Sequence, residues 1–136
     1  MTVSKAEIIL IINTEKLEDR RARAYTQSLP DIQVNERDVT QNPFTATQLA
    51  SLADDMKMPI SGLIDKTSSV YHNKLENSSF KPQELAEIVS SNPGVLRTPI
   101  IKANGQTFFV DSSFSMIKKA LMFKSVSSPS ASRGER

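Results

Sequence analysis

The sequence contains no cysteine, and this absence excludes more functions than any other feature of its composition. Thiol nucleophiles, disulfide exchange, thiolate metal ligands and iron–sulfur clusters all need a sulfur atom that this chain does not supply. The single histidine, His72, has neither a second histidine nor a carboxylate at a ligand spacing, so it predicts a surface residue and not a metal site. A Gly-x-Ser-x-Gly motif is also missing, which argues against a serine hydrolase. We therefore expect neither a metal nor a cofactor.

Long apolar segments are missing as well. The longest apolar run, residues 8–12, is far too short to cross a bilayer and is typical of a buried strand. Residues 1–7 contain a lysine and an acid and lead into only that short run, which falls short of the apolar region of a secretory signal. These features predict a cytoplasmic protein without a membrane anchor.

The charge is nearly balanced. Seventeen Lys and Arg residues face 15 Asp and Glu residues, for a formal net charge of +2. Such a balance releases few counterions on binding a polyanion unless the basic residues cluster on one face, so direct nucleic-acid binding is not expected. A chain of 136 residues with 38% hydrophobic residues suits one domain with a single core.

The first third of the chain has the pattern of a β-α-β unit. Residues 7–13 predict a buried strand, and residues 32–39 predict a half-exposed strand that pairs parallel to it. Between them, residues 15–29 predict an amphipathic helix with arginines on its polar side. The apolar positions of this helix are Leu17, Ala22, Ala24, Tyr25 and Leu29.

The middle of the chain predicts only helices and the end predicts a hairpin followed by a helix. Thr45 or Thr47 can cap the first of these helices, a short helix is expected over residues 59–64, a turn or helix over residues 68–75, and a clear helix over residues 81–91. The Asn-Gly pair at 104–105, with apolar residues on both sides, predicts a tight hairpin. Ser112 or Ser113 can cap a last helix, and the Ser-rich residues 125–136 predict a disordered tail after a domain of residues 1–124.

Three segments together resemble a known protein family. They are Ile-Asp-Lys-Thr-Ser-Ser-Val-Tyr at 64–71, Lys-Pro-Gln-Glu-Leu at 81–85 and Asn-Pro-Gly-Val-Leu-Arg-Thr-Pro-Ile-Ile at 92–101. Their order and spacing resemble the arsenate reductase (ArsC) and Spx family over roughly residues 8–121. The resemblance implies an α/β thioredoxin-like fold, βαβ, helical insertion and ββα, around a four-stranded mixed sheet. It also puts Pro99 where thioredoxin-like domains carry a cis-proline, although the sequence leaves the isomer open.

The residues that carry the chemistry of that family differ here. The resemblance puts Lys16 at the position of the nucleophilic cysteine, while Arg20 retains the arginine that follows it four residues later. The two oxyanion-binding arginines fall at Thr67 and Thr98, and the residue after the second hairpin strand is also changed. Lysine does not replace a thiolate at a helix N-terminus. We therefore expect a scaffold that has kept the fold and lost the reaction, and so not an enzyme.

Two functions of different classes follow from this resemblance. The first is binding of a protein partner in the bacterial cytoplasm, and the resemblance to Spx suggests RNA polymerase and a role in transcription or stress regulation. The alternative is a vestigial cleft that still holds a small anion or a glutathione-like ligand. Its candidate residues are Asn13, Thr14, Lys16, Arg20, Arg97, Thr98 and Pro99. A reductase that borrows its thiols from another protein is a weaker third option, and the oligomeric state is left open.

Overall fold

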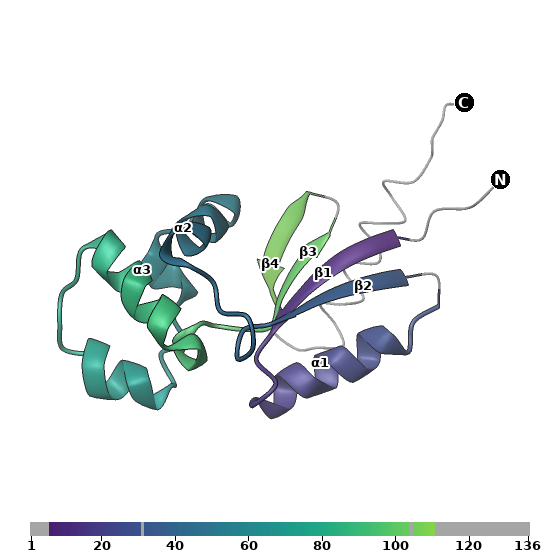
Figure 1. Ribbon diagram of the computed structural model, residues 1–136, viewed down its shortest axis with the longest axis horizontal. Coiled ribbons are helices and arrows are strands. Elements are labelled where there is room, and N and C mark those ends of the chain that lie inside the picture. The colour runs from purple at the N-terminus through teal and green to yellow at the C-terminus, as the bar shows by residue number, and fades with distance from the viewer. Residues whose placement is uncertain (1–5, 31, 104, 111–136) are drawn as a thin grey trace.

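A four-stranded mixed sheet in the order β2-β1-β3-β4 forms one half of the protein, and a group of helices forms the other (Figure 1). This computed structural model describes residues 6–30, 32–103 and 105–110. The strands are β1 (Ala6–Ile12), β2 (Ile32–Asp38), β3 (Ile100–Ala103) and β4 (Gln106–Phe109), and the helices are α1 (Leu17–Gln27), α2 (Ala46–Asp55) and α3 (Pro82–Ser91). Shorter turns are the 3-10 segments η1 (Ile60–Leu63) and η3 (Pro93–Val95) and the π-helical turn η2 (Tyr71–Leu75). The predicted βαβ, helical insertion and hairpin are confirmed.

Strand β1 is the centre of the sheet because its side chains supply apolar residues to both faces. It pairs parallel with β2 and antiparallel with β3. Ile8, Leu10 and Ile12 face one layer and Ile11 the other, and all four are at most 2% exposed. Side chains alternate between the faces of a strand, so an unbroken apolar run is what a strand buried on both sides requires.

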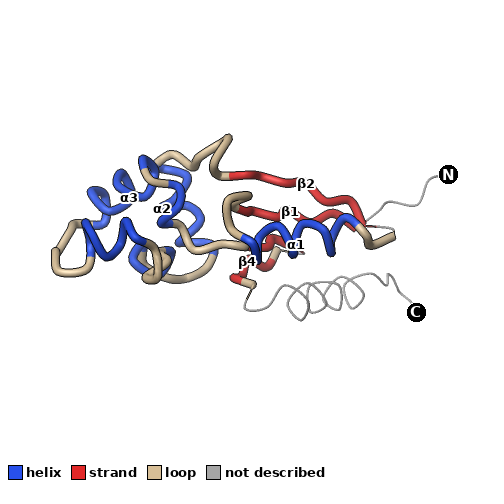
Figure 2. Tube along the Cα trace, turned by 90° about the horizontal axis from the view of Figure 1, so that it is seen from below, coloured by secondary structure: helices blue, strands red, loops and turns tan. Residues whose placement is uncertain are grey.

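Helix α1 covers the first of these faces, where it packs on β1 and β2 (Figure 2). It is shorter than the predicted helix over residues 15–29. Two of its predicted apolar positions are wrong: Leu17 is 52% exposed and Ala24 is also exposed. Leu17 is the first residue of the helix, and the residues of α1 that are buried come later, at Asp19, Ala22 and Thr26.

The helical insertion, which we define as residues 39–99, packs against the other face at one end of the sheet. Thr45 caps α2 as one of the two predicted candidates, since its hydroxyl accepts the N–H of Gln48 and the Gln48 side chain accepts the N–H of Thr45. Pro82 occupies the first turn of α3, where the missing N–H has no cost. Leu49, Leu52 and other side chains of the insertion form the core with Ile11 and Ile100.

The β3–β4 hairpin forms at the predicted position, with its two strands on either side of residues 104–105. Ala103 pairs with Gln106, and Gly105 between them has φ +75°, the left-handed region that glycine adopts without strain. The Thr98–Pro99 bond just before β3 is cis. The predicted last helix after Ser112 or Ser113, the end of the 1–124 domain and the 125–136 tail lie outside the described residues.

Candidate functional site

The loop between β1 and α1 is held in a tight turn by Asn13 and Asp19. Asn13 is 2% exposed, and its backbone N–H donates to Oδ2 of Asp19 over 2.8 Å. Its side-chain Oδ1 accepts the N–H of Glu15, and its carbonyl accepts the N–H of Lys16. The N-cap residue Lys16 makes no capping bond with its own side chain, and the bonds of Asn13 and Asp19 fix the loop just before α1, which begins at Leu17.

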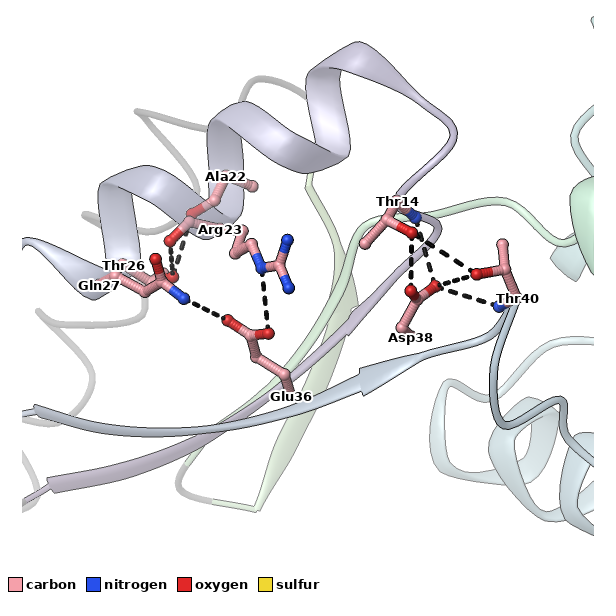
Figure 3. A network of polar contacts seen from close by, with 8 residues as sticks. All are labelled: Thr14, Ala22, Arg23, Thr26, Gln27, Glu36, Asp38 and Thr40. Atoms are coloured by element: carbon pink, nitrogen blue, oxygen red, sulfur yellow. Dashed lines mark hydrogen bonds and ion pairs between the residues drawn. The ribbon is translucent and has the colours of Figure 1, made fainter.

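Thr14 fastens the same loop to the end of β2. Its hydroxyl donates to Oδ2 of Asp38 over 2.6 Å, and Oδ1 of Asp38 accepts both the hydroxyl and the N–H of Thr40 (Figure 3). Partial burial favours the neutral acid, but these hydrogen bonds outweigh it and hold the pKa of Asp38 below its ordinary value. The cluster therefore ties the adjacent ends of the two parallel strands together.

The side chain of Lys16 connects α1 to the helical insertion. Its Nζ donates to Oδ2 of Asp65 over 3.1 Å and to the carbonyl of Leu96 over 3.2 Å, residues that lie 49 and 80 positions away. The two acceptors are adjacent because Ile64 and Leu96 form a bridge, in which Asp65 N–H donates to the Val95 carbonyl. The ammonium at the predicted cysteine position is thus bound internally.

Asp65 has a second set of donors. Its Oδ1 accepts the hydroxyl and the N–H of Thr67 over 2.6 and 2.9 Å. Burial opposes ionisation, but the Thr67 bonds and the Lys16 ammonium together hold the pKa of Asp65 below its ordinary value. The carboxylate is therefore ionised at neutral pH and pairs with a charged lysine.

A second carboxyl group, that of Asp19, lies close enough to Lys16 and Asp65 to interact with their charges. Asp19 is 1% exposed, and burial raises its pKa, while the Thr98 hydroxyl, the Asn13 N–H and Lys16 offset the rise only in part. The Thr98 Oγ1 atom is itself buried and meets full hydrogen-bond geometry with no group in the described part of the chain. Thr98 precedes β3, which pairs with β1, and its side chain lies close enough to Asp19 of α1 to act on the pKa of that carboxyl.

An open hollow of about 580 Å³ lies next to the Lys16–Asp65 pair. Asp65, Lys66, Thr67, Arg97 and Thr98 are among its lining residues, and the guanidinium of Arg97 lies 4.0 Å from the ring centre of Phe109. Of the seven residues predicted for the cleft, Arg97 and Thr98 line this hollow. Lys16 bonds to Asp65, which also lines it, and Pro99 follows Thr98 in the chain. The structure thus gathers part of the predicted set in one place.

The remaining predicted residues are engaged elsewhere. Arg20 Nη1 donates to the carbonyl of Thr14 over 2.8 Å, so this exposed arginine bonds to the β1–α1 loop. Arg21 pairs with Glu18, and Arg23 pairs with Glu36 of β2 (Figure 3). Asn13, Thr14 and Arg20 are not among the described residues that line the hollow. The arginines of α1 therefore point to different partners instead of converging on one ligand.

The expectation for His72 needs one correction. It is exposed as predicted, but a carboxylate does lie at a suitable spacing: Glu76, one helical turn later, has Oε1 3.1 Å from Nδ1 of His72. Two side chains are fewer than a metal needs, and the pair forms an ordinary surface contact.

Comparison with known proteins rests on the fold, since the sequence matches no family model and no curated protein. Arsenate reductase from Vibrio cholerae has a TM-score of 0.72 at 14% identity, over 87% of this chain and 98% of that one. A candidate arsenate reductase from Yersinia pestis has a TM-score of 0.66 at 15% identity, over 82% and 98% of the two chains. This chain has the arsenate reductase fold.

A third similar structure agrees with this assignment. An ArsC-family-related protein from Bacteroides fragilis has a TM-score of 0.67 at 12% identity, over 82% of this chain and 95% of that one. At such identities the likeness establishes the thioredoxin-like fold and leaves the activity to the residues of this chain. None of the helices in residues 6–110, as far as they are described, has the length and apolar content to span a membrane.

Sequence reasoning about this arsenate reductase fold missed the carboxyl groups of the site. Asp65 stood inside the segment that carried the resemblance, yet no role was given to it. A lysine at the position expected for a nucleophile needs a counter-charge when it is half-buried, and that requirement was a usable signal. Asp19 was also detectable, because an acid three residues after an N-cap often bonds back to the N-terminal loop.

Proposed function

We propose that this protein has lost catalysis and acts by binding another protein. The observation that supports this most is the state of Lys16, whose ammonium is held by Asp65 and the Leu96 carbonyl where the resemblance puts a thiolate. A protonated lysine bound in this way has no lone pair to attack an oxyanion, and the chain has no cysteine to replace it. Asp65, whose pKa is lowered, adds a carboxylate to the lining of the adjoining hollow, and this negative charge disfavours an anionic substrate there.

A direct test of the lost catalysis is thiol-dependent arsenate reduction by the purified full chain. We expect no turnover above the rate without protein, with glutathione or with a reduced thioredoxin as the thiol donor. Turnover that scales with the concentration of this chain would refute the proposal. The outcome depends on chemistry alone, so it does not require the partner to be known.

The partner is proposed from the resemblance to Spx, which makes RNA polymerase the first protein to examine and the bacterial cytoplasm the place to look. Purified RNA polymerase and the tagged full chain are mixed at equal concentration, and complex formation is followed by sedimentation or cross-linking. A stable complex that survives competition by an unrelated acidic protein supports the proposal. Absence of a complex with the polymerase removes this partner, and recovery of no specific protein from native lysate removes the partner-binding role itself.

A second candidate function has its own observation. Lys66 and Arg97 line the 580 Å³ hollow, so two cationic side chains border the space that a small anion or a glutathione-like ligand would occupy. Thermal unfolding with arsenate, phosphate, sulfate or glutathione tests this: a ligand at 100 times its Kd adds about 2.7 kcal/mol of stability. The response should disappear in Lys66→Gln. A response that persists in Lys66→Gln would place the ligand outside this hollow, and one that persists in Arg20→Ala would remove the predicted cleft as its cause.

A further inference from the structure

A different hollow lies on the face of the sheet opposite α1, between the strands and α2. Its volume is about 230 Å³, and Ile9, Ile11, Phe44 and Leu52 form its apolar part. It continues into a second hollow of about 430 Å³ through the shared residues Ile9, Asp55 and Lys102. None of the candidate cleft residues lines either hollow within the described part of the chain, so this surface is separate from the Lys16 region.

The floor of this surface is exposed because the helical insertion covers only one end of the sheet. Ile11 and Ile100, paired across β1 and β3, are 2% and 0% exposed beneath the insertion. One row further along, Ile9 pairs with Lys102, and Ile9 is 40% exposed. An isoleucine at the centre of a sheet, open to solvent and beside a hollow, is a typical apolar contact point of a protein interface.

A rigidly held arginine borders the hollow. Arg37 Nε donates to the carbonyl of Asn42 over 3.0 Å, and Nη2 donates to the carbonyl of Pro43 and to Oε1 of Gln48. Its guanidinium also lies 3.9 Å from the ring centre of Phe44. No hydrogen bond within the described residues engages Nη1 of this side chain. Because the guanidinium is already fixed, an incoming carboxylate would meet a positioned donor at little cost in side-chain entropy.

The second cation of the hollow is loosely held. Lys102 Nζ lies 3.4 Å from Oδ2 of Asp55, and the two side chains are 37% and 46% exposed. An exposed pair of this kind contributes little to stability, so another carboxylate can share or replace Asp55 at low cost. With Arg37 and Lys102 against Asp55, the charged residues lining the hollow sum to +1, whereas Glu7 lies in the adjoining hollow. The positive end of the surface is therefore the Arg37 end.

We propose that this surface docks a segment of a partner protein in which an apolar side chain is adjacent to a carboxylate. The apolar side chain lies on Ile9, and the carboxylate is received by Nη1 of Arg37 at the end away from Glu7, while Lys102, which lines both hollows, adds positive charge to the surface. The inference rests on the proposed protein-binding function and adds the face and the chemistry of the partner. Charge complementarity at the Arg37 end and the exposed isoleucine beside it are its two supports.

The test uses the full chain and short synthetic peptides with a central Leu-Glu, Leu-Gln or Leu-Lys pair in otherwise identical neutral sequences. Binding is measured by fluorescence anisotropy at low and at physiological salt. We expect Leu-Glu to bind about tenfold more tightly than Leu-Gln, with Leu-Lys weaker still and with the preference reduced by salt. Equal binding of the three peptides, or no binding of any, would overturn the proposal.

Variants locate the site. Lys102→Glu should remove the preference for Leu-Glu, Lys102→Arg should keep it, and Lys66→Glu is the matched control because Lys66 lines the other hollow. Ile9→Ser should weaken all three peptides alike, and its folding is checked by circular dichroism. If a partner captured by the wild-type chain binds Lys102→Glu and Ile9→Ser equally well, this surface is wrong while the protein-binding function stands.

Discussion

Substituting Lys16 and Asp65 tests whether the ion pair between them holds α1 to the helical insertion. The variants are Lys16→Met, Asp65→Asn and the double variant, and the assay is urea unfolding of the full chain at pH 7. The coupling free energy is the part of the double-variant effect that the two single variants do not explain. Lys16→Met leaves Asp65 with its two bonds from Thr67, and Asp65→Asn leaves Lys16 with the Leu96 carbonyl, so neither single variant strands an isolated group.

The magnitude follows from distance and burial. Unit charges at the 3.1 Å separation of Nζ and Oδ2 attract by about 5 kcal/mol at an effective dielectric of about 20. Most of this is offset by lost hydration, and fully exposed pairs retain only about 0.2–1 kcal/mol. The Lys16 and Asp65 side chains are 26% and 22% exposed. We therefore expect a coupling of about 1–2 kcal/mol, between the values typical of exposed and buried pairs.

A control pair on the same helix makes the result decisive. Arg21 and Glu18 are 2.8 Å apart but each is 61% exposed, so their coupling should stay at about 0.2–0.5 kcal/mol. Because the pKa of Asp65 is lowered, its contribution is present above the ordinary carboxyl pKa and is lost as the pH falls towards its folded value. A Lys16–Asp65 coupling no larger than that of the control pair would refute the structural role of this contact.

Four further variants test stability. Asp19→Asn should raise the free energy of unfolding at neutral pH, because the raised pKa means that ionisation of the buried carboxyl removes stability as the pH rises from its ordinary pKa through the folded one. Asp38→Asn should lower the free energy of unfolding, because the ionised Asp38, whose pKa is lowered, contributes stability above the ordinary carboxyl pKa that is lost as the pH falls below it. Both variants are measured by urea unfolding at several pH values. A change in the free energy of unfolding with the same sign for both variants would contradict this pair of assignments. Lys57→Gly should stabilise the protein by about 1 kcal/mol, because Lys57 directly follows the C-cap of α2 with φ 57°, and a lower Tm for the variant would show that no strain is relieved. Gly105→Ala should destabilise the hairpin by about 1 kcal/mol or more, because its φ of +75° disfavours a side chain, and an unchanged urea midpoint would argue against this turn geometry.

Local signals in the sequence predicted much of the fold. The apolar run of β1, the cap at Thr45 and the Asn-Gly turn each act over a few residues, so their patterns carry directly into structure. The exposure of Leu17 was not predictable in this way. Within the first turn of α1, Leu17 is 52% exposed while Asp19 is 1% exposed, and which of the two is covered depends on how the whole molecule packs around the helix.

The candidate site, like the fold, was predictable from the sequence only in part. The lack of cysteine and the lysine at position 16 are statements about composition and order, and by themselves they exclude thiol chemistry. Only the tertiary structure decided that Asp65 and the Leu96 carbonyl hold the Lys16 ammonium, and that Asp19 lies buried beside Thr98. These groups are far apart in the chain and meet through the pairing of β1 with β3 and the bridge between Ile64 and Leu96. Local propensity carries no information about contacts made over such separations, because they depend on how the whole sheet and the helical insertion pack.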